Sequence, residues 1–196
     1  ESGGRLAAKA RVTDALLDAL ADQPGSGLTG LTGFTIACPA FPENQRTVFK
    51  GHLFVGDQLL SDSGMRNHPL TPMTDANLVR VLQAQLHGPA RRRVGLVDHR
   101  AVAASAASIG ERFAALQADG IDIAIVDAVS NDDLHRLGEA VAPMALVCAG
   151  STALWEGAER RGGKFDVWLS VCVLGVEKDR VEKDRVAVRS KLDGGH

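Results

Sequence analysis

A guanidinium and an imidazole lie two residues apart in the segment GMRNHPLTPMT, which covers residues 64–74. Arg66 can grip a carboxylate through two parallel hydrogen bonds, and His68 can donate a further one. Thr71 and Thr74 add hydroxyl groups that suit a hydroxylated ligand. A predicted helix follows, and the unpaired N–H groups at a helix amino terminus attract anions. These side chains therefore predict a site for a small polyhydroxy acid.

The same segment has a second interpretation, in which Thr74 or a neighbour only caps the helix. Arg66 is then solvated, and His68 fills space before Pro69. Asp75 complements the helix dipole by itself, which weakens the case for a bound anion. On the chemistry of the side chains alone, both interpretations stay open.

Polar residues also follow the predicted strands, where α/β proteins bind ligands. The stretch ACPAFPENQRTVFKGH offers either a ligand loop or a rigid proline-bounded connection. Asp127 ends one strand and Ser151 follows another, whereas Asp132 and Asp133 are better explained as complements to a helix dipole. The further polar candidates in the first stretch are Glu43, Asn44, Arg46 and His52.

Several familiar catalytic patterns are missing from the sequence. It contains no phosphate-binding Walker loop and no Gly-x-Ser-x-Gly elbow, and no dinucleotide-binding Gly-x-Gly-x-x-Gly motif follows a predicted strand. The cysteines are Cys38, Cys148 and Cys172, which are too far apart for a zinc site and lie in apolar runs that predict buried thiols. No metal ligand and no individual catalytic residue is therefore predicted.

Apolar stretches alternate with helical patterns through the middle of the chain, and this order predicts parallel strands joined by crossover helices. We expect an α/β fold with an open, mainly parallel sheet flanked by helices, and a hairpin insertion turning at Lys50-Gly51. Asp133 and Ser130 form a capping-box pattern. The predicted strands are 34–38, 94–97, 121–128 and 145–150, the hairpin is 46–55, and the helices are 12–21, about 75–86, 101–118 and 130–141.

The bulk composition excludes some partners. The 196 residues carry a net charge of −2, include 4% aromatic residues and contain no tyrosine, which argues against nucleic acid as a partner. No apolar run is long enough to cross a membrane and no signal peptide opens the chain, so a cytoplasmic protein is expected. The five-residue repeat VEKDRVEKDR at 176–185 predicts solvated charge.

The residues 34–83, from FTIACPAFPENQRTVFKGH to SGMRNHPLTPMTDANLVRVLQ, closely resemble the four-carbon acid sugar kinases, and most closely those acting on 3-oxo-tetronate. VGLVDH, GIDIAIVDAVSNDDLHRLGEA and LVCAGSTAL extend the likeness over roughly residues 12–154. The resemblance implies an amino-terminal substrate-binding domain of an enzyme that phosphorylates a 3-oxo-tetronate, threonate or erythronate type of acid with ATP. Within GMRNHP, it makes Arg66 and His68 the best substrate contacts.

The chain also departs from that family. The Asp-Asp-x-Thr-Gly motif of the family is absent from the chain, and Gln45 and Thr152 stand where the family has glycines. We expect residues 1–155 to form the substrate-binding domain and residues 156–196 a divergent charged tail.

ATP and Mg are implied by the family, but their binding site is not expected in this chain, which is therefore expected to be inactive alone. Its expected partners are a four-carbon acid sugar and either a nucleotide-binding domain or a second copy of the chain. The alternative is a non-catalytic small-acid-binding or assembly module descended from such a kinase.

Overall fold

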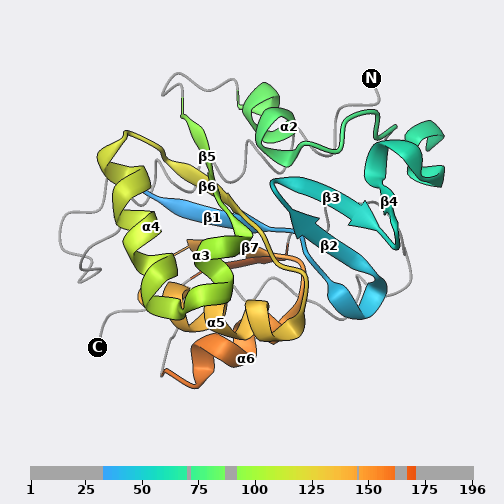
Figure 1. The fold of residues 1–196 in the computed structure, drawn as a ribbon. Helices are drawn as coiled ribbons and strands as arrows, with labels where there is room; N and C mark the ends of the chain where they lie inside the picture. Colours follow the sequence, from blue (N-terminus) through green and yellow to red (C-terminus); the bar gives the residue numbers. More distant parts are fainter. Residues whose placement is uncertain (1–32, 70–71, 87–91, 145, 162–166, 171–196) are drawn as a thin grey trace, which may run out of the picture.

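The computed structural model describes residues 33–69, 72–86, 92–144, 146–161 and 167–170. The larger of its two sheets has five parallel strands in the order β5-β6-β1-β7-β8 (Figure 1). This confirms the expected α/β fold with a parallel sheet. The strands are β1 Thr35–Cys38, β5 Val94–Val97, β6 Ile123–Val126, β7 Leu146–Ala149 and β8 Val167–Ser170.

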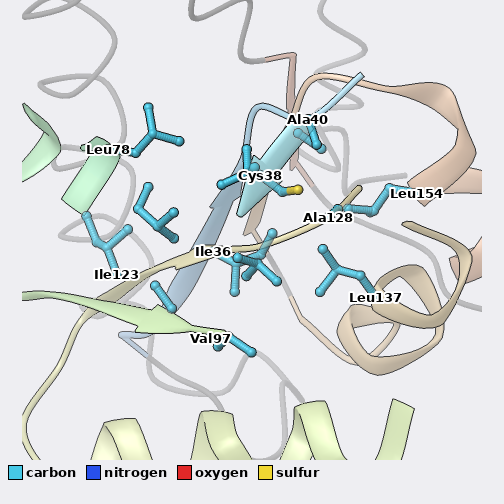
Figure 2. Close-up of a cluster of buried hydrophobic side chains, with 14 of the residues drawn as sticks. Ile36, Cys38, Ala40, Leu78, Val97, Ile123, Ala128, Leu137 and Leu154 are labelled. Atoms are coloured by element: carbon cyan, nitrogen blue, oxygen red, sulfur yellow. The ribbon is translucent and has the colours of Figure 1, made fainter. Parts of the chain in front are cut away.

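Mainly apolar residues, about half of them β-branched, build the central strands because both faces of a parallel sheet are covered. All four residues of β6 are buried, and Ile36 of β1 pairs with Ala124 of β6 on one side and Val147 of β7 on the other. The side chains of Ile36, Val97, Leu137 and Leu154 gather in one apolar cluster (Figure 2). The sheet is thus the centre of the core.

Four helices, α3 to α6, lie on one side of the sheet in Figure 1, and α2 lies near its other side, beside β5. Their bounds are α2 Leu78–Gln85, α3 His99–Ala104, α4 Ala106–Ala118, α5 Asn131–Val141 and α6 Thr152–Glu159.

The prediction of a single helix over 101–118 is wrong, because these residues belong to two helices, which meet at Ser105. Ser105 has an extended backbone with φ of −176°, and its hydroxyl accepts a hydrogen bond from the Ser108 N–H. Serine competes well for backbone donors in this way, so it begins a new helix where alanine would have continued the old one.

The capping residue of α2 also differs from the expected one. Asn77, and not Thr74, precedes α2, and its side-chain oxygen accepts a hydrogen bond from the Arg80 N–H at 3.0 Å. Asp75 in turn accepts a hydrogen bond from the Asn77 N–H, so a short polar turn precedes the helix. The capping box of Ser130 and Asp133 at the start of α5 is confirmed.

The hairpin prediction is confirmed, and the hairpin belongs to a second, three-stranded antiparallel sheet. Its turn residues Lys50 and Gly51 have φ of 52° and 71°, the left-handed values that a tight two-residue turn needs. Three short 3-10 helices flank the sheet. The elements are β2 Arg46–Phe49, β3 His52–Val55, β4 Gln58–Leu59, η1 Pro42–Asn44, η2 Leu60–Asp62 and η3 Gly64–Asn67.

Two of the three cysteines lie in the described residues, and both are buried and outside any disulfide, as predicted. Burial raises the pKa of Cys38 to about 12, so this thiol stays protonated and unreactive at neutral pH. Cys172, the predicted helix over 12–21 and the charged repeat lie outside the described residues.

Helix α6 runs across residue 155, and β8 joins the sheet beside β7. The division at residue 155 stays a prediction. In the part of the chain that the structure describes, no helix has the length and apolar composition needed to cross a membrane.

Helices α5 and α6 cross at two glycines. A Cβ atom on Gly157 would lie 2.2 Å from the carbonyl oxygen of His135, and one on Gly138 would lie 2.1 Å from that of Leu154. Both contacts are with backbone, so neither helix can relieve them by moving a side chain. Glycine at these positions sets how closely the two helices pack.

We therefore expect Gly157→Ala to destabilise the protein by about 3 kcal/mol or more, because the helices must separate. Urea unfolding followed by circular dichroism measures the change. Gly110→Ala in α4 is the matched control, since its Cβ would meet no atom within 4 Å. The control should be neutral or stabilise by up to about 1 kcal/mol through helix propensity. Equal effects of the two variants would contradict the close crossing.

Candidate functional site

The carboxyl ends of the parallel strands share one edge of the large sheet, and Asp127 lies there, directly after β6. Its carboxylate accepts hydrogen bonds from the Lys50 and Gly51 N–H groups, both at 2.8 Å, and from the His99 N–H at 2.9 Å. Asp127 is fully buried. These contacts tie the tip of the hairpin and the start of α3 to the end of β6.

Burial raises the pKa of Asp127, and the backbone N–H groups of Gly51, Lys50 and His99 oppose this shift. The carboxylate is surrounded by internal donors that use its oxygens. In this arrangement Asp127 organises the edge of the sheet, and its predicted role as a ligand contact stays a prediction.

A second buried carboxylate, Asp133, lies in the first turn of α5. It accepts hydrogen bonds from the Val129 and Ser130 N–H groups and from the Arg136 guanidinium, the last at 2.6 Å. The His99 Nε2 lies 3.4 Å from the same carboxylate. His99 therefore links the two acids, with its backbone bound to Asp127 and its ring beside Asp133.

Burial alone would raise the pKa of Asp133, but the hydrogen bonds from Val129, Ser130 and Arg136, together with His99 nearby, outweigh it. The pKa of Asp133 consequently lies below its ordinary value. A carboxylate with a lowered pKa stabilises the fold while it is charged.

The hairpin places His52 between the turn and helix α2. Its Nδ1 lies 2.8 Å from the Lys50 carbonyl oxygen, and its Nε2 lies 3.4 Å from the Asn77 side-chain nitrogen. Arg46 begins β2, and its backbone pairs with Phe41 across the base of the 42–44 loop. His52 is thus next to the turn that Asp127 holds, on the side facing α2.

Arg66 and His68 lie in and just after η3, beside the small sheet. The Ser63 hydroxyl accepts a hydrogen bond from the Met65 N–H, and the Met73 N–H donates to the Met65 carbonyl. The second bond closes the proline-containing loop onto the residues before α2. Arg66 and Thr74 are exposed, His68 is partly buried, and Thr71 lies outside the described residues.

The remaining candidates surround the large sheet's carboxyl edge. Glu43 and Asn44 are exposed in η1, and Glu43 accepts a hydrogen bond from the Asn131 side chain at 3.1 Å. Ser151 is buried and caps α6, where its hydroxyl accepts a hydrogen bond from the Ala153 N–H. Ser151 has a capping contact here, and its predicted ligand role stays a prediction.

The described contacts thus arrange the candidates in two groups. One group, with Asp127, Ser151 and Glu43, lies at the carboxyl edge of the large sheet. The other, with Arg66 and His68, lies beside the small sheet on the loop that precedes α2. Through the Lys50-Gly51 turn, His52 connects the first group to α2.

Sequence reasoning missed His99 and Asn77. His99 comes two residues after the end of a predicted strand, which is a position that could have singled it out. Asn77 gave a weaker signal, because Thr74 and Asp75 nearby are also capping residue types. Within the described residues, no three histidine, cysteine or acidic side chains cluster closely enough to hold a metal ion.

Parallel strands, covering helices and polar loops at the carboxyl ends of the strands define an open α/β domain, a class of protein in which ligands bind beyond those strand ends. Residues 9–158 match the family model described as a sugar-binding N-terminal domain. The chain belongs to this family of sugar-binding amino-terminal domains, and its relatives include 3-oxo-tetronate kinases.

The 3-oxo-tetronate kinase of Pseudomonas savastanoi is 54% identical over 149 residues, which are 74% of this chain and 34% of the relative. That of Cupriavidus necator is 61% identical over 118 residues, 60% of this chain and 26% of the relative. The chain therefore spans about a third or less of the length of these curated relatives.

Two solved structures are also similar. The Haemophilus influenzae protein HI1011 has 47% identity and a TM-score of 0.65, with 79% of this chain and 34% of that one covered. A Bordetella bronchiseptica protein was crystallised with bound citrate as a domain-swapped dimer. It has 26% identity and a TM-score of 0.50, with 66% of this chain and 29% of that one covered.

We expect Asp127→Asn to destabilise the protein by about 2–4 kcal/mol. The amide keeps one acceptor oxygen but points an N–H₂ donor at backbone donors, so at least one buried N–H loses its partner. Chemical denaturation gives the free energy change, and hydrogen exchange at Lys50 and Gly51 localises it. The exposed Asp57→Asn is the matched control, with an expected change within about 0.5 kcal/mol. Unchanged exchange at the turn in Asp127→Asn would contradict the assigned anchor.

The lowered pKa of Asp133 predicts a dependence of stability on pH. Its contribution is fully present above the unfolded-state pKa of about 3.9 and is lost as the pH falls through the lower folded-state value. The difference in unfolding free energy between the wild type and Asp133→Asn should therefore shrink below about pH 4. Urea titrations at a series of pH values test this, and a difference that grows on acidification would refute it.

Proposed function

We propose that this domain binds a four-carbon sugar acid of the 3-oxo-tetronate type and presents it for phosphorylation in an ATP-dependent kinase. The observation that carries the proposal is Arg66, an exposed guanidinium in the GMRNHP segment of a domain whose family is described as sugar-binding. A carboxylate ligand would complete the hydrogen bonding of this guanidinium.

Some of the other arginines are occupied by the protein's own acids. Arg80 pairs with Asp75, and Arg136 pairs with Asp133, both at 2.6 Å. Within the described residues, no acidic side chain makes such a pair with Arg66. Its planar fork is therefore available to an external acid, with His68 two residues further on and the Thr74 hydroxyl on the same loop.

The Bordetella relative crystallised with citrate supports an acidic ligand, because citrate is a small hydroxylated carboxylic acid. The names of the 3-oxo-tetronate kinases support a four-carbon acid in particular. Arg46, His52, Thr71, Asp127 and Ser151 belong to the same proposal as secondary contacts.

In the proposed reaction, ATP with its magnesium supplies the phosphoryl group and the charge that stabilises its transfer. The role of this chain is to bind the carboxylate and orient a hydroxyl of the acid, which is the positioning part of the catalysis. We assign no residue of this chain to ATP or to magnesium. We propose a cytoplasmic location, where ATP is available, and we propose that the 196-residue chain alone binds the acid without phosphorylating it.

The test is calorimetry with a four-carbon sugar acid and with the neutral polyol erythritol. Arg66→Lys keeps the charge but loses the bidentate fork, so we expect acid affinity to fall by about tenfold or more, for a loss of about 1.5–3 kcal/mol. Binding of the polyol should change little.

Arg112→Lys, at an exposed position on α4, is the matched control and should bind the acid as the wild type does. Equal affinity for acid and polyol, or equal effects of the two substitutions, would refute the role of Arg66. ATP turnover with the acid by the chain alone, lost in Arg66→Lys, would show that the chain is itself a complete kinase. If added ATP leaves acid binding unchanged, and no longer form of the protein turns the acid over, the results would favour the small-acid-binding module.

A further inference from the structure

The His52 ring lies between two groups of different hydrogen-bonding character. On one side is the Lys50 carbonyl oxygen, 2.8 Å from Nδ1, and on the other is the Asn77 side-chain nitrogen, 3.4 Å from Nε2. The backbones of His52 and Asn77 also form an antiparallel bridge. The ring is therefore held between the hairpin turn and the residue that caps α2.

These contacts fix the tautomer of His52. A carbonyl oxygen only accepts hydrogen bonds, so Nδ1 must carry the proton. In the neutral ring, Nε2 is then an acceptor, which matches a donor N–H₂ group on Asn77.

The helix fixes the orientation of the Asn77 amide independently. Its oxygen accepts the Arg80 N–H at 3.0 Å, which is the side-chain cap of α2, so its nitrogen must face His52. A continuous series of hydrogen bonds thus runs from the Arg80 N–H through Asn77 and His52 to Lys50, whose own N–H is bound by Asp127.

From this arrangement we infer that His52 and Asn77 form a proton-sensitive coupling between the hairpin turn and the amino end of α2. When Nε2 gains a proton, two donors face each other across the His52–Asn77 contact. Asn77 can satisfy the imidazolium by rotating its oxygen toward it, but the Arg80 N–H then loses its cap. The coupling and the cap coexist only while His52 is neutral. This inference concerns the protein's own hydrogen bonds and stands whether or not the domain binds a sugar acid.

The charged groups around the ring do not remove this conflict. Asp75 is held by Arg80 through two hydrogen bonds of 2.6 and 2.7 Å, and Asp127 is held by backbone N–H groups. The Lys50 side chain is exposed at the turn. Within the described residues, no hydrogen bond joins any of these groups to the His52 Nε2, which contacts the Asn77 amide.

The experiment is a site-resolved NMR titration of the full chain between about pH 5 and 8, where histidine titrates. At the upper end, long-range nitrogen–proton spectra should show His52 protonated at Nδ1 and bare at Nε2. Through the titration of His52, the hydrogen-exchange protection of the Arg80 amide should fall roughly fivefold, as expected for loss of a helix cap.

Two substitutions of Asn77 give expectations that differ from each other and from the wild type. Asn77→Ser keeps a capping oxygen without the amide donor, so the Arg80 amide should no longer respond to His52. Asn77→Asp supplies an acceptor to both partners, so the midpoint of the His52 titration should move to higher pH and Arg80 protection should rise on acidification. Melting curves establish that each variant is folded.

An Nε2–H tautomer in the wild-type protein overturns the inference without any variant. The same acid response in Asn77→Ser as in the wild type also overturns it, because the response would then not pass through the amide.

Discussion

The buried carboxylate of Asp127 is the constraint on which the arrangement of the two sheets depends. Its oxygens accept hydrogen bonds from Lys50, Gly51 and His99, which lie 77, 76 and 28 residues away in the sequence. An acid this deeply buried is costly unless donors surround it, so the hairpin tip and the start of α3 must reach the end of β6 together. The adjacent Val48–Ala128 bridge continues the same connection along the backbone.

A second buried acid extends this organisation to the helices. Asp133 accepts hydrogen bonds from backbone N–H groups just before α5 and from the Arg136 guanidinium. The same guanidinium donates a hydrogen bond to the Val102 carbonyl of α3 at 2.9 Å. His99 lies between the two acids. Strand ends, hairpin tip and helix starts at this edge are therefore fixed by polar contacts, while the glycine crossing of α5 and α6 fixes the layer behind them.

The loop with Arg66 and His68 is built differently, since it is attached by a few backbone bonds beside the small sheet and leaves Arg66 exposed. The two regions have distinct physical roles. Buried acids with internal partners maintain the scaffold, and Arg66, an exposed cation with no acidic partner among the described residues, is the proposed contact for an external ligand. Helix α2 follows this loop directly and contacts the hairpin through His52 and Asn77, so it joins the scaffold to the proposed binding segment.

The sequence by itself determined the parallel sheet, the hairpin turn and the capping box of α5. These follow from local rules: β-branched runs between helical patterns, a Lys-Gly pair between strands, and serine three residues before aspartate. The strong similarity over GMRNHPLTPM also identified the family and singled out Arg66 and His68, because a run of this length is far more specific than a short motif.

Only the tertiary structure decided which polar residues have internal partners. Asp127 and Arg66 looked alike as candidates, yet one is fully buried among backbone donors and the other is exposed. Asn77 was chosen over Thr74 as the cap because Leu78 and Ala76 bond to the hairpin backbone at Gly51 and Leu53, which fixes where α2 begins. His99 and Asn77 gained their roles from segments distant in sequence, and no local pattern records such contacts because they exist only after the chain has folded.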